Sequence, residues 1–476
     1  MKKIFLSKPN KYILLYLILS AILIIFCVSK SSPLYPFNDW FDANCYFTVG
    51  KSLWKGLVVY KDLFEQKGPL LYFLHALAYL VSQDTFLGVY FLEVIAASFF
   101  AYFVYKIILL FSKKPLWVFI PLVMTLIYTS ASFSHGDSAE EFCLPLLTYG
   151  LYLLLKNQKT KETLSFREAL LLGLTSGMVL WIKFSLLGFY LGWIIMPLIT
   201  YLKDKKYREL GTLILGIILG VILITLPFFI YFLVNNALAD WFTVYFYDNI
   251  FIYHQAGSLI NAFTKTIFNN PWIWILILGG LISLFKEPKV LAATLLTLIT
   301  SVLLVYSGGR SYVYYGLIFA IYAPLSLLMF DYLPPFNKFK IWSILILLVS
   351  VSLSYFLTPN AYLRKYSKED LPQYRFAKII NKIPNATLLN YGFLDGGFYT
   401  AANIFPSERF FCQLNIELPE MTESLTSALS EGRVDFIVSS HKLKNSYNYE
   451  LVASEDFPYE KMTFTYYLYR KIGLTN

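Results

Sequence analysis

Long apolar runs alternate with short polar segments over the first three quarters of the chain. Most runs are about 15 to 25 residues long, close to the length that a helix needs to cross the hydrocarbon core of a bilayer. The pattern predicts an α-helical polytopic membrane protein with about eleven transmembrane helices. The expected spans are 12–27, 86–111, 116–133, 142–155, 169–182, 186–202, 210–234, 271–285, 290–306, 312–330 and 341–357.

The composition agrees with a membrane protein. Only 15% of the residues are charged and 57% are hydrophobic, whereas about a quarter of the residues of a soluble protein are charged. The net charge of +10 is also typical of nucleic-acid-binding proteins, but here Lys and Arg lie mainly in short loops between apolar runs. We therefore expect the lipid bilayer as a partner and no nucleic acid. The first run has no small-residue cleavage site after it, which favours an uncleaved anchor.

The charged loops predict the orientation of the chain. When eleven spans are counted, five loops rich in Lys and Arg fall on the same side as the N-terminus, and the positive-inside rule makes that side cytoplasmic. The other loops and the tail then face outward. This count leaves out the apolar run 69–82, which is only about 14 residues long. We expect it to form an interfacial or half-inserted helix on the outer side, with a twelfth span as the alternative.

The tail from residue 358 to residue 476 has a different character. It is charged and interrupted by prolines, and β-like runs at 386–391, 434–438 and 464–469 alternate with a helical stretch at 421–431. This pattern predicts a small α/β domain. We therefore divide the chain into a transmembrane domain, 1–357, and an extracytoplasmic C-terminal α/β domain, 358–476.

The four cysteines, Cys27, Cys45, Cys143 and Cys412, lack the spacing of a metal site. Two of them lie in or beside apolar runs. We interpret all four as small apolar side chains without a chemical role.

Two carboxylates follow the first span. Asp39 and Asp42 lie among aromatic residues, and Tyr46 follows Asp42 on the same face of a helix expected at 42–54 along the membrane surface. A carboxylate close to the bilayer is unfavourable unless it is hydrated, paired or used in a reaction. Asp42 is therefore a candidate catalytic residue. A solvated acid that caps the helix is the alternative for Asp39 and, taken alone, for Asp42.

A second group of acids lies in the next outer loop. Asp137, Glu140 and Glu141 fall within five residues, directly before an expected span. Either they line a polar cavity with Asp42 or they cap the next helix at its positive end. Three acids exceed what capping requires, which favours the cavity. Glu93, inside the second span, is expected to face other helices.

Three basic residues complete the outer side. Lys67 precedes a Gly68-Pro69 turn, so it is expected near headgroup depth, and Lys183 and Arg310 lie at the outer ends of later spans. Each alone is explained as an interfacial anchor. Together they suit a substrate that carries a phosphate and an acceptor that must lose a proton.

The order of these residues resembles a known family. The series Asp42-x-x-x-Tyr46, then Lys67-x-Pro69-Leu70-x-Tyr72, then acids that open a later span, is similar to the glycosyltransferase-C superfamily. The resemblance is to its protein O-mannosyltransferase and lipid A aminoarabinose transferase members, over roughly residues 1–357. Members of this group take a sugar from a polyprenyl-phosphate carrier on the outer face of the membrane.

The resemblance implies roles for individual residues. Asp42 matches the catalytic aspartate of an Asp-Glu motif, but Ala43 stands at the Glu position, so Asp39 becomes the nearest candidate for a second acid. Glu140 or Glu141 matches the acid of the second loop.

The basic residues have counterparts as well. Lys67 matches the lysine of a Lys-Pro stretch, with Gly68 inserted. Arg310 and Tyr312 resemble a Gly-Arg-x-Tyr-x-His-Tyr pattern in which Tyr314 replaces the histidine. Lys67, Lys183 and Arg310 would bind the donor phosphate, and Tyr46, Tyr72, Tyr312 and Tyr314 would line the substrate site.

The resemblance implies a glycosyltransferase that moves a hexose or pentose from a polyprenyl-phosphate donor to a hydroxyl of a cell-envelope glycan or lipid. Asp42 would act as the general base. No glycine-rich phosphate loop is present, so no nucleotide-sugar site is expected. No cofactor is assigned, and a divalent metal between Asp42 and the second-loop acids is an alternative that we do not favour. A transporter or flippase of a lipid-linked sugar is the rival function. It is disfavoured because the spans show no repeat and the polar residues gather on one face.

Overall fold

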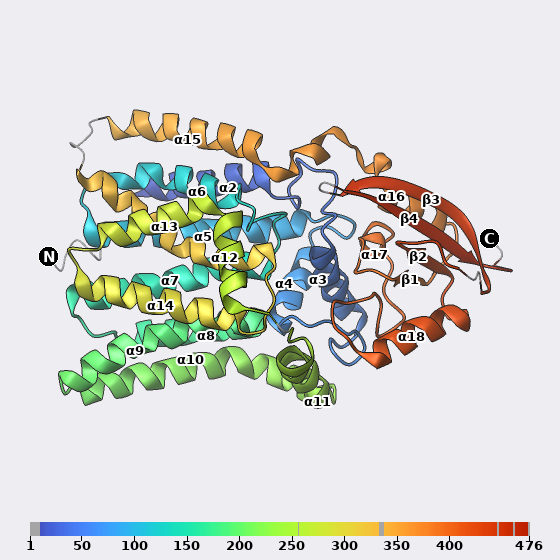
Figure 1. Cartoon of the computed structure of the whole chain (residues 1–476), viewed down its shortest axis with the longest axis horizontal. Helices are drawn as coiled ribbons and strands as arrows, with labels where there is room; N and C mark the ends of the chain where they lie inside the picture. Colours follow the sequence, from blue (N-terminus) through green and yellow to red (C-terminus); the bar gives the residue numbers. More distant parts are fainter. Residues whose placement is uncertain (1–9, 256, 333–337, 445–446, 460–461, 475–476) are drawn as a thin grey trace. The chain divides into compact units, whose positions relative to one another are not determined.

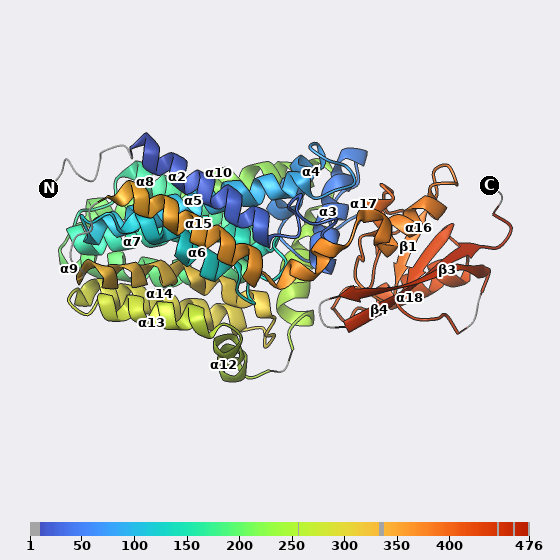
Figure 2. The same ribbon diagram turned by 90° about the horizontal axis from the view of Figure 1, so that it is seen from above.

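A computed structural model describes residues 10–255, 257–332, 338–444, 447–459 and 462–474. The chain forms two compact units (Figures 1 and 2). Unit 1 comprises Met1–Ser29, Leu92–Phe228 and Gln255–Ala361, and unit 2 comprises Lys30–Phe91, Phe229–His254 and Tyr362–Asn476. Unit 2 contains the tail together with two earlier segments, so its bounds differ from the expected domain division at 357/358. That division stays a prediction.

Unit 1 is a bundle of apolar helices. Seven helices of the described chain are long and apolar enough to cross a membrane, or eight if the bent pair α12–α13 counts as one span. The expected number, about eleven, also included α7, the short helix Leu116–Tyr128, and a division of Phe166–Lys203 into two spans. The helices that lie wholly or mostly in unit 1 are α2 (Lys11–Val28), α5 (Leu87–Phe111), α6 (Ile120–Tyr128), α7 (Ala139–Thr160), α8 (Phe166–Lys183), α9 (Gly188–Lys203), α10 (Tyr207–Val234), α12 (Leu259–Asn269), α13 (Pro271–Ser283), α14 (Pro288–Tyr306), the 3₁₀ helix η5 (Val313–Tyr332) and α15 (Phe339–Leu357).

The continuous helical stretch Phe166–Lys203 reverses direction at a 3₁₀ turn, η3 (Phe184–Leu187). Helix α8 runs antiparallel to α7, whereas α9 runs parallel to α7, so α8 and α9 are antiparallel to each other. The stretch therefore passes along the bundle twice, as the sequence predicts for two spans. The contacts that set these directions are Lys156–Glu168 and Lys183–Glu140 between α7 and α8, and Leu146–Tyr190 and Gly150–Trp193 between α7 and α9.

The basic loops that were predicted to share one side lie at one end of unit 1. Lys159, in the last turn of α7, forms an ion pair with Glu287, which precedes α14. Lys114, after α5, donates a hydrogen bond to the carbonyl of Asp331 at the end of η5. The beginning of α2 is at the same end, where Tyr12 contacts the ring of Trp117. Which face of the membrane this end meets stays a prediction.

Unit 2 contains two short helices from the first polar region, α3 (Phe41–Ser52) and α4 (Pro69–Tyr79). Helix α4 has 11 residues and is about 16 Å long, too short for the hydrocarbon core; the run 69–82 is therefore no span of its own. Helix α3 forms where the sequence predicts it, but every residue from Ala43 to Ser52 is buried. It is thus not a surface helix with one exposed face. The remaining helical segments before the tail are η1 (Leu53–Lys55), α11 (Leu238–Phe242) and the π-helical η4 (Thr243–Ile252).

The tail forms a mixed four-stranded sheet in the order β1-β2-β4-β3. Strand β1 is parallel to β2, and the other pairs are antiparallel. Three strands and one helix lie where the sequence predicts them; β3 was missed. It is an edge strand that carries Glu450, Glu455, Asp456 and Pro458, and an edge tolerates charge and proline that an interior strand does not. The elements are η6 (Pro359–Lys365), η7 (Lys368–Asp370), α16 (Pro372–Ile380), β1 (Leu388–Tyr391), α17 (Phe398–Ala401), α18 (Pro419–Ser430), β2 (Phe436–Ser439), β3 (Tyr449–Tyr459) and β4 (Met462–Lys471).

Candidate active site

Helix α3 positions Asp42 in its first turn, where the partial positive charge of a helix N-terminus favours a carboxylate. Tyr46 lies one turn later on the same face, and its hydroxyl donates a hydrogen bond to Oδ2 of Asp42 at 3.4 Å. The pairing expected from the four-residue spacing is therefore present. Tyr46 is buried, whereas Asp42 is only partly buried, so the carboxylate is oriented by the protein and still accessible.

Lys67 and Tyr72 lie at the start of α4, and a third residue, Glu65, joins them. The carboxylate of Glu65 accepts hydrogen bonds from the Tyr72 hydroxyl and from the backbone N–H of Lys67, the latter at 3.0 Å. The ammonium group of Lys67 lies 5.6 Å from the centre of the Tyr46 ring, within cation–π range. Tyr46 thus contacts both Asp42 and Lys67. We call Asp42, Tyr46, Glu65, Lys67 and Tyr72 the α3–α4 cluster.

Glu65 received no role from the sequence, although it stands two residues before Lys67. Its side chain is buried, and burial raises its pKa, with a further upward contribution from the negative charge of Asp42. The charge of Lys67 opposes this rise. The sequence signal was an acid next to the Gly-Pro turn, which is also common in ordinary loops.

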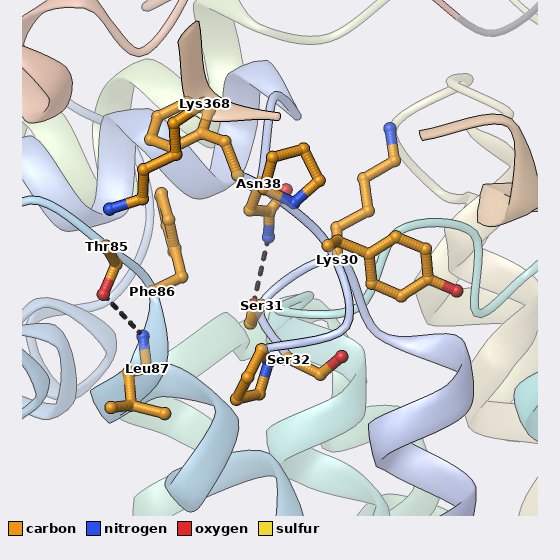
Figure 3. A pocket seen from close by; sticks show the side chains of 12 residues that line it. Lys30, Ser31, Ser32, Asn38, Thr85, Phe86, Leu87 and Lys368 are labelled. Carbon is orange, nitrogen blue, oxygen red and sulfur yellow. Dashed lines mark hydrogen bonds between the residues drawn. The ribbon is translucent and has the colours of Figure 1, made fainter. Parts of the chain in front are cut away.

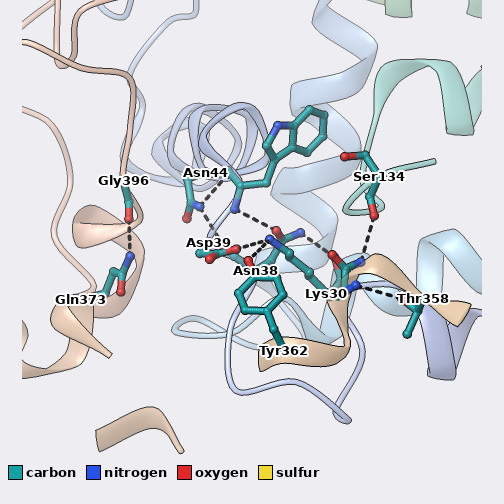
Figure 4. Close-up of polar contacts among 12 residues, drawn as sticks. Lys30, Asn38, Asp39, Asn44, Ser134, Thr358, Tyr362, Gln373 and Gly396 are labelled. Carbon is teal, nitrogen blue, oxygen red and sulfur yellow. Dashed lines mark hydrogen bonds and ion pairs between the residues drawn. The ribbon is translucent and has the colours of Figure 1, made fainter. Parts of the chain in front are cut away.

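Asp39, the expected second acid, has a different partner. Its carboxylate forms an ion pair of 2.6 Å with Lys30, and both side chains are almost fully buried. Lys30 also donates to the hydroxyl of Tyr362 at 3.1 Å (Figure 4). Its ammonium group lies over the ring of Tyr459 as well. A buried ion pair of this kind fixes the geometry of the loop after α2, because removal of one partner leaves a buried charge.

The second-loop acids separate into two groups. Asp137 and Glu141 join Glu93: the backbone N–H of Asp137 donates to Glu93 at 2.9 Å and to Glu141 at 2.8 Å. The hydroxyl of Ser29 donates to both carboxylate oxygens of Glu93, at 2.8 and 2.7 Å. These contacts identify the partners of Glu93 that the sequence left open. We call Ser29, Glu93, Asp137 and Glu141 the acidic cluster.

The turn before α7 brings this cluster together. Gly136 has φ of 84°, and a Cβ at this position would lie 2.5 Å from both Glu93 Oε1 and the Ser29 hydroxyl, so only glycine fits. Ser138 caps α7 by accepting from the backbone N–H of Glu141 at 3.1 Å. The cap is therefore a serine, and capping alone does not account for the acids.

Glu140 belongs to the second group. It forms an ion pair of 2.5 Å with Lys183, at the end of α8. The Lys183 ammonium lies 3.6 Å from the centre of the Tyr315 ring and 5.5 Å from that of Tyr314.

Arg310 extends this second group. Its guanidinium donates to the hydroxyl of Tyr312 at 3.2 Å, and the Tyr312 and Tyr314 rings are stacked at 5.5 Å. The structure thus brings two of the three expected basic residues into one group of unit 1. We call Glu140, Lys183, Arg310, Tyr312, Tyr314 and Tyr315 the basic–tyrosine cluster.

The acids do not assemble as metal ligands. Among the residues that the structure describes, no group of three or more His, Cys, Asp or Glu side chains has the geometry to hold a metal ion. Asp39 and Glu140 are each paired with a lysine. Asp42 lies in unit 2 and the second-loop acids lie in unit 1, so the metal alternative between them stays a prediction.

Two cavities lie within single units. One, of about 320 Å³, is lined in unit 2 by residues that include Ser31, Asn38, Phe86 and Lys368 (Figure 3), but neither Asp42 nor Lys67 lines it. The other, of about 300 Å³, lies among α8, α9 and α10 of unit 1. Its walls are apolar apart from Ser176 and Tyr190, and Leu187, which also lines it, follows Lys183 by four residues.

Comparisons with known proteins give a structural likeness only. No protein-family model matches the chain, and no curated protein matches it in sequence. ArnT from Cupriavidus metallidurans bound to undecaprenyl phosphate is similar with a TM-score of 0.62 and 12% identity, over 97% of this chain and 98% of ArnT. The apo state of the same protein gives a TM-score of 0.64 and 12% identity, over 96% and 97% of the two chains. This chain is therefore an α-helical polytopic membrane protein that shares the fold of ArnT over nearly its full length.

Proposed function

We propose that this protein transfers a sugar from a polyprenyl-phosphate-sugar to a hydroxyl group of a cell-envelope glycan or lipid. The observation that carries the proposal is the α3–α4 cluster, in which Asp42 is held by Tyr46 beside Lys67. The likeness to ArnT, which was solved with undecaprenyl phosphate bound, supports a donor of this class.

In the proposed reaction the acceptor hydroxyl attacks the anomeric carbon of the sugar and gives its proton to Asp42. The new bond joins the acceptor oxygen to this carbon, and the bond from the carbon to the phosphate oxygen breaks, with inversion. Lys67 stabilises the negative charge of the departing phosphate, since a preorganised cation in a partly buried site acts most strongly on developing charge.

The remaining predicted residues have proposed roles of different kinds. Glu65 positions Lys67 by accepting a hydrogen bond from the backbone N–H of Lys67. It also takes the place of the second acid, because Asp39 is bound to Lys30. Arg310 is assigned to the donor phosphate on the sequence resemblance, and Lys183 on its place at the outer end of a span. Their joint position in the basic–tyrosine cluster supports these assignments, which require the phosphate to share Lys183 with Glu140.

The apolar cavity among α8, α9 and α10 suits one segment of the prenyl chain, because its walls offer few polar groups to a hydrocarbon. We place the reaction on the outer face of the plasma membrane and the N-terminus in the cytoplasm. The joint position of the basic loops at one end of unit 1 supports this orientation through the positive-inside rule.

The first test replaces Asp42 by asparagine, which keeps the shape of the side chain and removes the base. We expect Asp42→Asn to lower sugar transfer by about 10²–10⁴-fold, the usual contribution of a general base. The measurement is transfer from a radiolabelled polyprenyl-phosphate-sugar in purified membranes, at matched protein level.

The matched control is Asp84→Asn, which makes the same chemical change at an exposed carboxylate paired with Lys368; it should retain full activity. Near-wild-type transfer by Asp42→Asn would remove the assignment. Repeating the assay in detergent, where no compartments exist, distinguishes an enzyme from a transporter of the same lipid.

A further inference from the structure

Two of the four cysteines lie against each other in unit 2. The sulfur atoms of Cys45 and Cys412 are 3.9 Å apart, although the residues are separated by 367 positions in the chain. Both side chains are almost fully buried, with exposed fractions of 1%. Nothing in the spacing of the two cysteines along the chain relates α3 to the tail, so their proximity was not predicted.

Backbone hydrogen bonds hold the segments that carry these two cysteines. Cys45 lies inside α3, one turn after Asp42. Next to Cys412, the carbonyl of Phe411 accepts from the N–H of Asn390 at 3.3 Å, and the N–H of Gln413 donates to the carbonyl of Phe393 at 2.9 Å. The short distance between the two sulfurs is therefore set by hydrogen-bonded backbone in both segments.

We propose that Cys45 and Cys412 form a disulfide bond that ties the helix of Asp42 to the tail. A disulfide needs a sulfur separation of about 2.05 Å, so each sulfur must move by only about 1 Å from its present position. Side-chain rotation about χ1 and small backbone shifts supply movements of this size.

The oxidation requires an acceptor for two electrons. Each thiol loses its hydrogen, one sulfur–sulfur bond forms, and two electrons and two protons pass to the disulfide of a thiol oxidoreductase, which becomes a dithiol. Oxidants of this class act in extracytoplasmic compartments. The inference therefore rests on the orientation given in the proposed function, in which unit 2 lies outside.

The bond is expected to form while the chain folds. Burial raises the pKa of both thiols in the folded protein, and the thiolate is the reactive form. A bond closed during folding is then buried with both sulfurs, out of reach of the external thiolate that would have to attack it for reduction.

Thiol counting on the wild-type full chain tests the proposal. The protein is purified from membranes and denatured in SDS with an alkylating reagent present. Its mass is measured by mass spectrometry at this point, and again after reduction and a second alkylation. We expect two alkylated cysteines before reduction and four after it, together with a linked peptide that contains Cys45 and Cys412. Four alkylated cysteines before reduction would overturn the proposal.

Two single variants identify the pair and control for each other. Cys45→Ser should show three alkylated cysteines both before and after reduction, because Cys412 has lost its partner. Cys27→Ser, in α2 of unit 1, should show one before reduction and three after it. One alkylated cysteine before reduction in Cys45→Ser, and three in Cys27→Ser, would place the bond elsewhere and overturn the assignment.

The outcome is independent of catalysis. Asp42→Asn should keep the wild-type thiol count, since it does not touch either sulfur. If all four thiols are free while transfer still depends on Asp42, the disulfide is excluded and the proposed function stands. If the disulfide is present while Asp42→Asn is fully active, the function is wrong and the bond stands.

Discussion

Asp39 and Glu65 are two buried carboxylates of the same polar region, and their surroundings separate their roles. Asp39 is neutralised by Lys30 at 2.6 Å. The carboxylate of Glu65 accepts hydrogen bonds from the Tyr72 hydroxyl and from the backbone N–H of Lys67. Distance along the chain favoured Asp39 as the second acid, but proximity to Asp42 and Lys67 in space favours Glu65.

Substitution of Glu65 tests whether it positions Lys67. Glu65→Gln keeps an acceptor for the Tyr72 hydroxyl and the Lys67 N–H, so its thermal stability in detergent should stay close to wild type. Glu65→Leu leaves these buried donors unsatisfied, which costs about 1–3 kcal/mol of unfolding free energy. We expect a lower melting temperature for Glu65→Leu alone, and a larger loss of sugar transfer for Glu65→Leu than for Glu65→Gln, which loses only the negative charge. Equal melting temperatures and equal transfer for the two variants would contradict this role.

Helix α3 shows how an element found from sequence acquires an environment that its pattern does not indicate. Thr48 donates to the carboxylate of Asp395 at 2.6 Å, and the buried Lys51 donates to the carbonyl of Tyr399 at 2.6 Å. These contacts come from the tail, which covers the polar face of the helix. The helix was expected along the membrane surface, but its residues from Ala43 to Ser52 are buried by tertiary contacts.

The pH dependence of stability should report the burial of Lys51. Burial lowers its pKa from 10.5 to about 7, partly opposed by the charge of Asp395. Below pH 7 the lysine is charged in both states and the folded state carries the desolvation penalty. Between pH 7 and 10.5 only the unfolded state binds the proton, so the unfolding free energy should rise with pH, by at most about 1.4 kcal/mol per pH unit.

The measurement is the melting temperature between pH 7 and 9. Lys51→Met should show a smaller increase with pH than the wild type. Lys55→Met, one turn further along and exposed, should keep the wild-type increase. A slope unchanged by Lys51→Met would show that the lysine is hydrated or does not titrate in this range.

Unit 2 as a whole is assembled from three separate segments of the chain. The tail supplies the partners of α3 that are buried with it, namely Asp395, Tyr399 and Cys412. Unit 1 is made of helices whose backbone hydrogen bonds are internal, as a bilayer requires. The two units should therefore respond differently to loss of the tail.

A chain that ends at Ala361 tests this dependence. We expect residues 30–91 to become sensitive to protease, because α3 loses the groups that satisfy Thr48 and Lys51. Residues 92–228 should stay protected in the same detergent. The measurement is limited proteolysis with peptide identification by mass spectrometry, with the full chain as the control. Protection of α3 without the tail would show that the first polar region folds independently.

The sequence by itself determined the membrane class, most of the apolar helices, the position of α3, three of the four strands and the sharing of one end by the basic loops. These features depend on hydropathy, charge and periodicity, which are properties of short stretches. It also singled out Asp42, Tyr46, Lys67 and Tyr72, which the structure brings together in one cluster.

Tertiary structure alone decided which polar groups meet. The choice of Glu65 over Asp39, the contact of Ser29 with Glu93, the burial of α3 and the meeting of Cys45 with Cys412 all depend on atoms from different elements. A hydrogen bond or ion pair is set by distances of about 3 Å, and no local pattern of residue types records such distances between segments that are far apart in the chain.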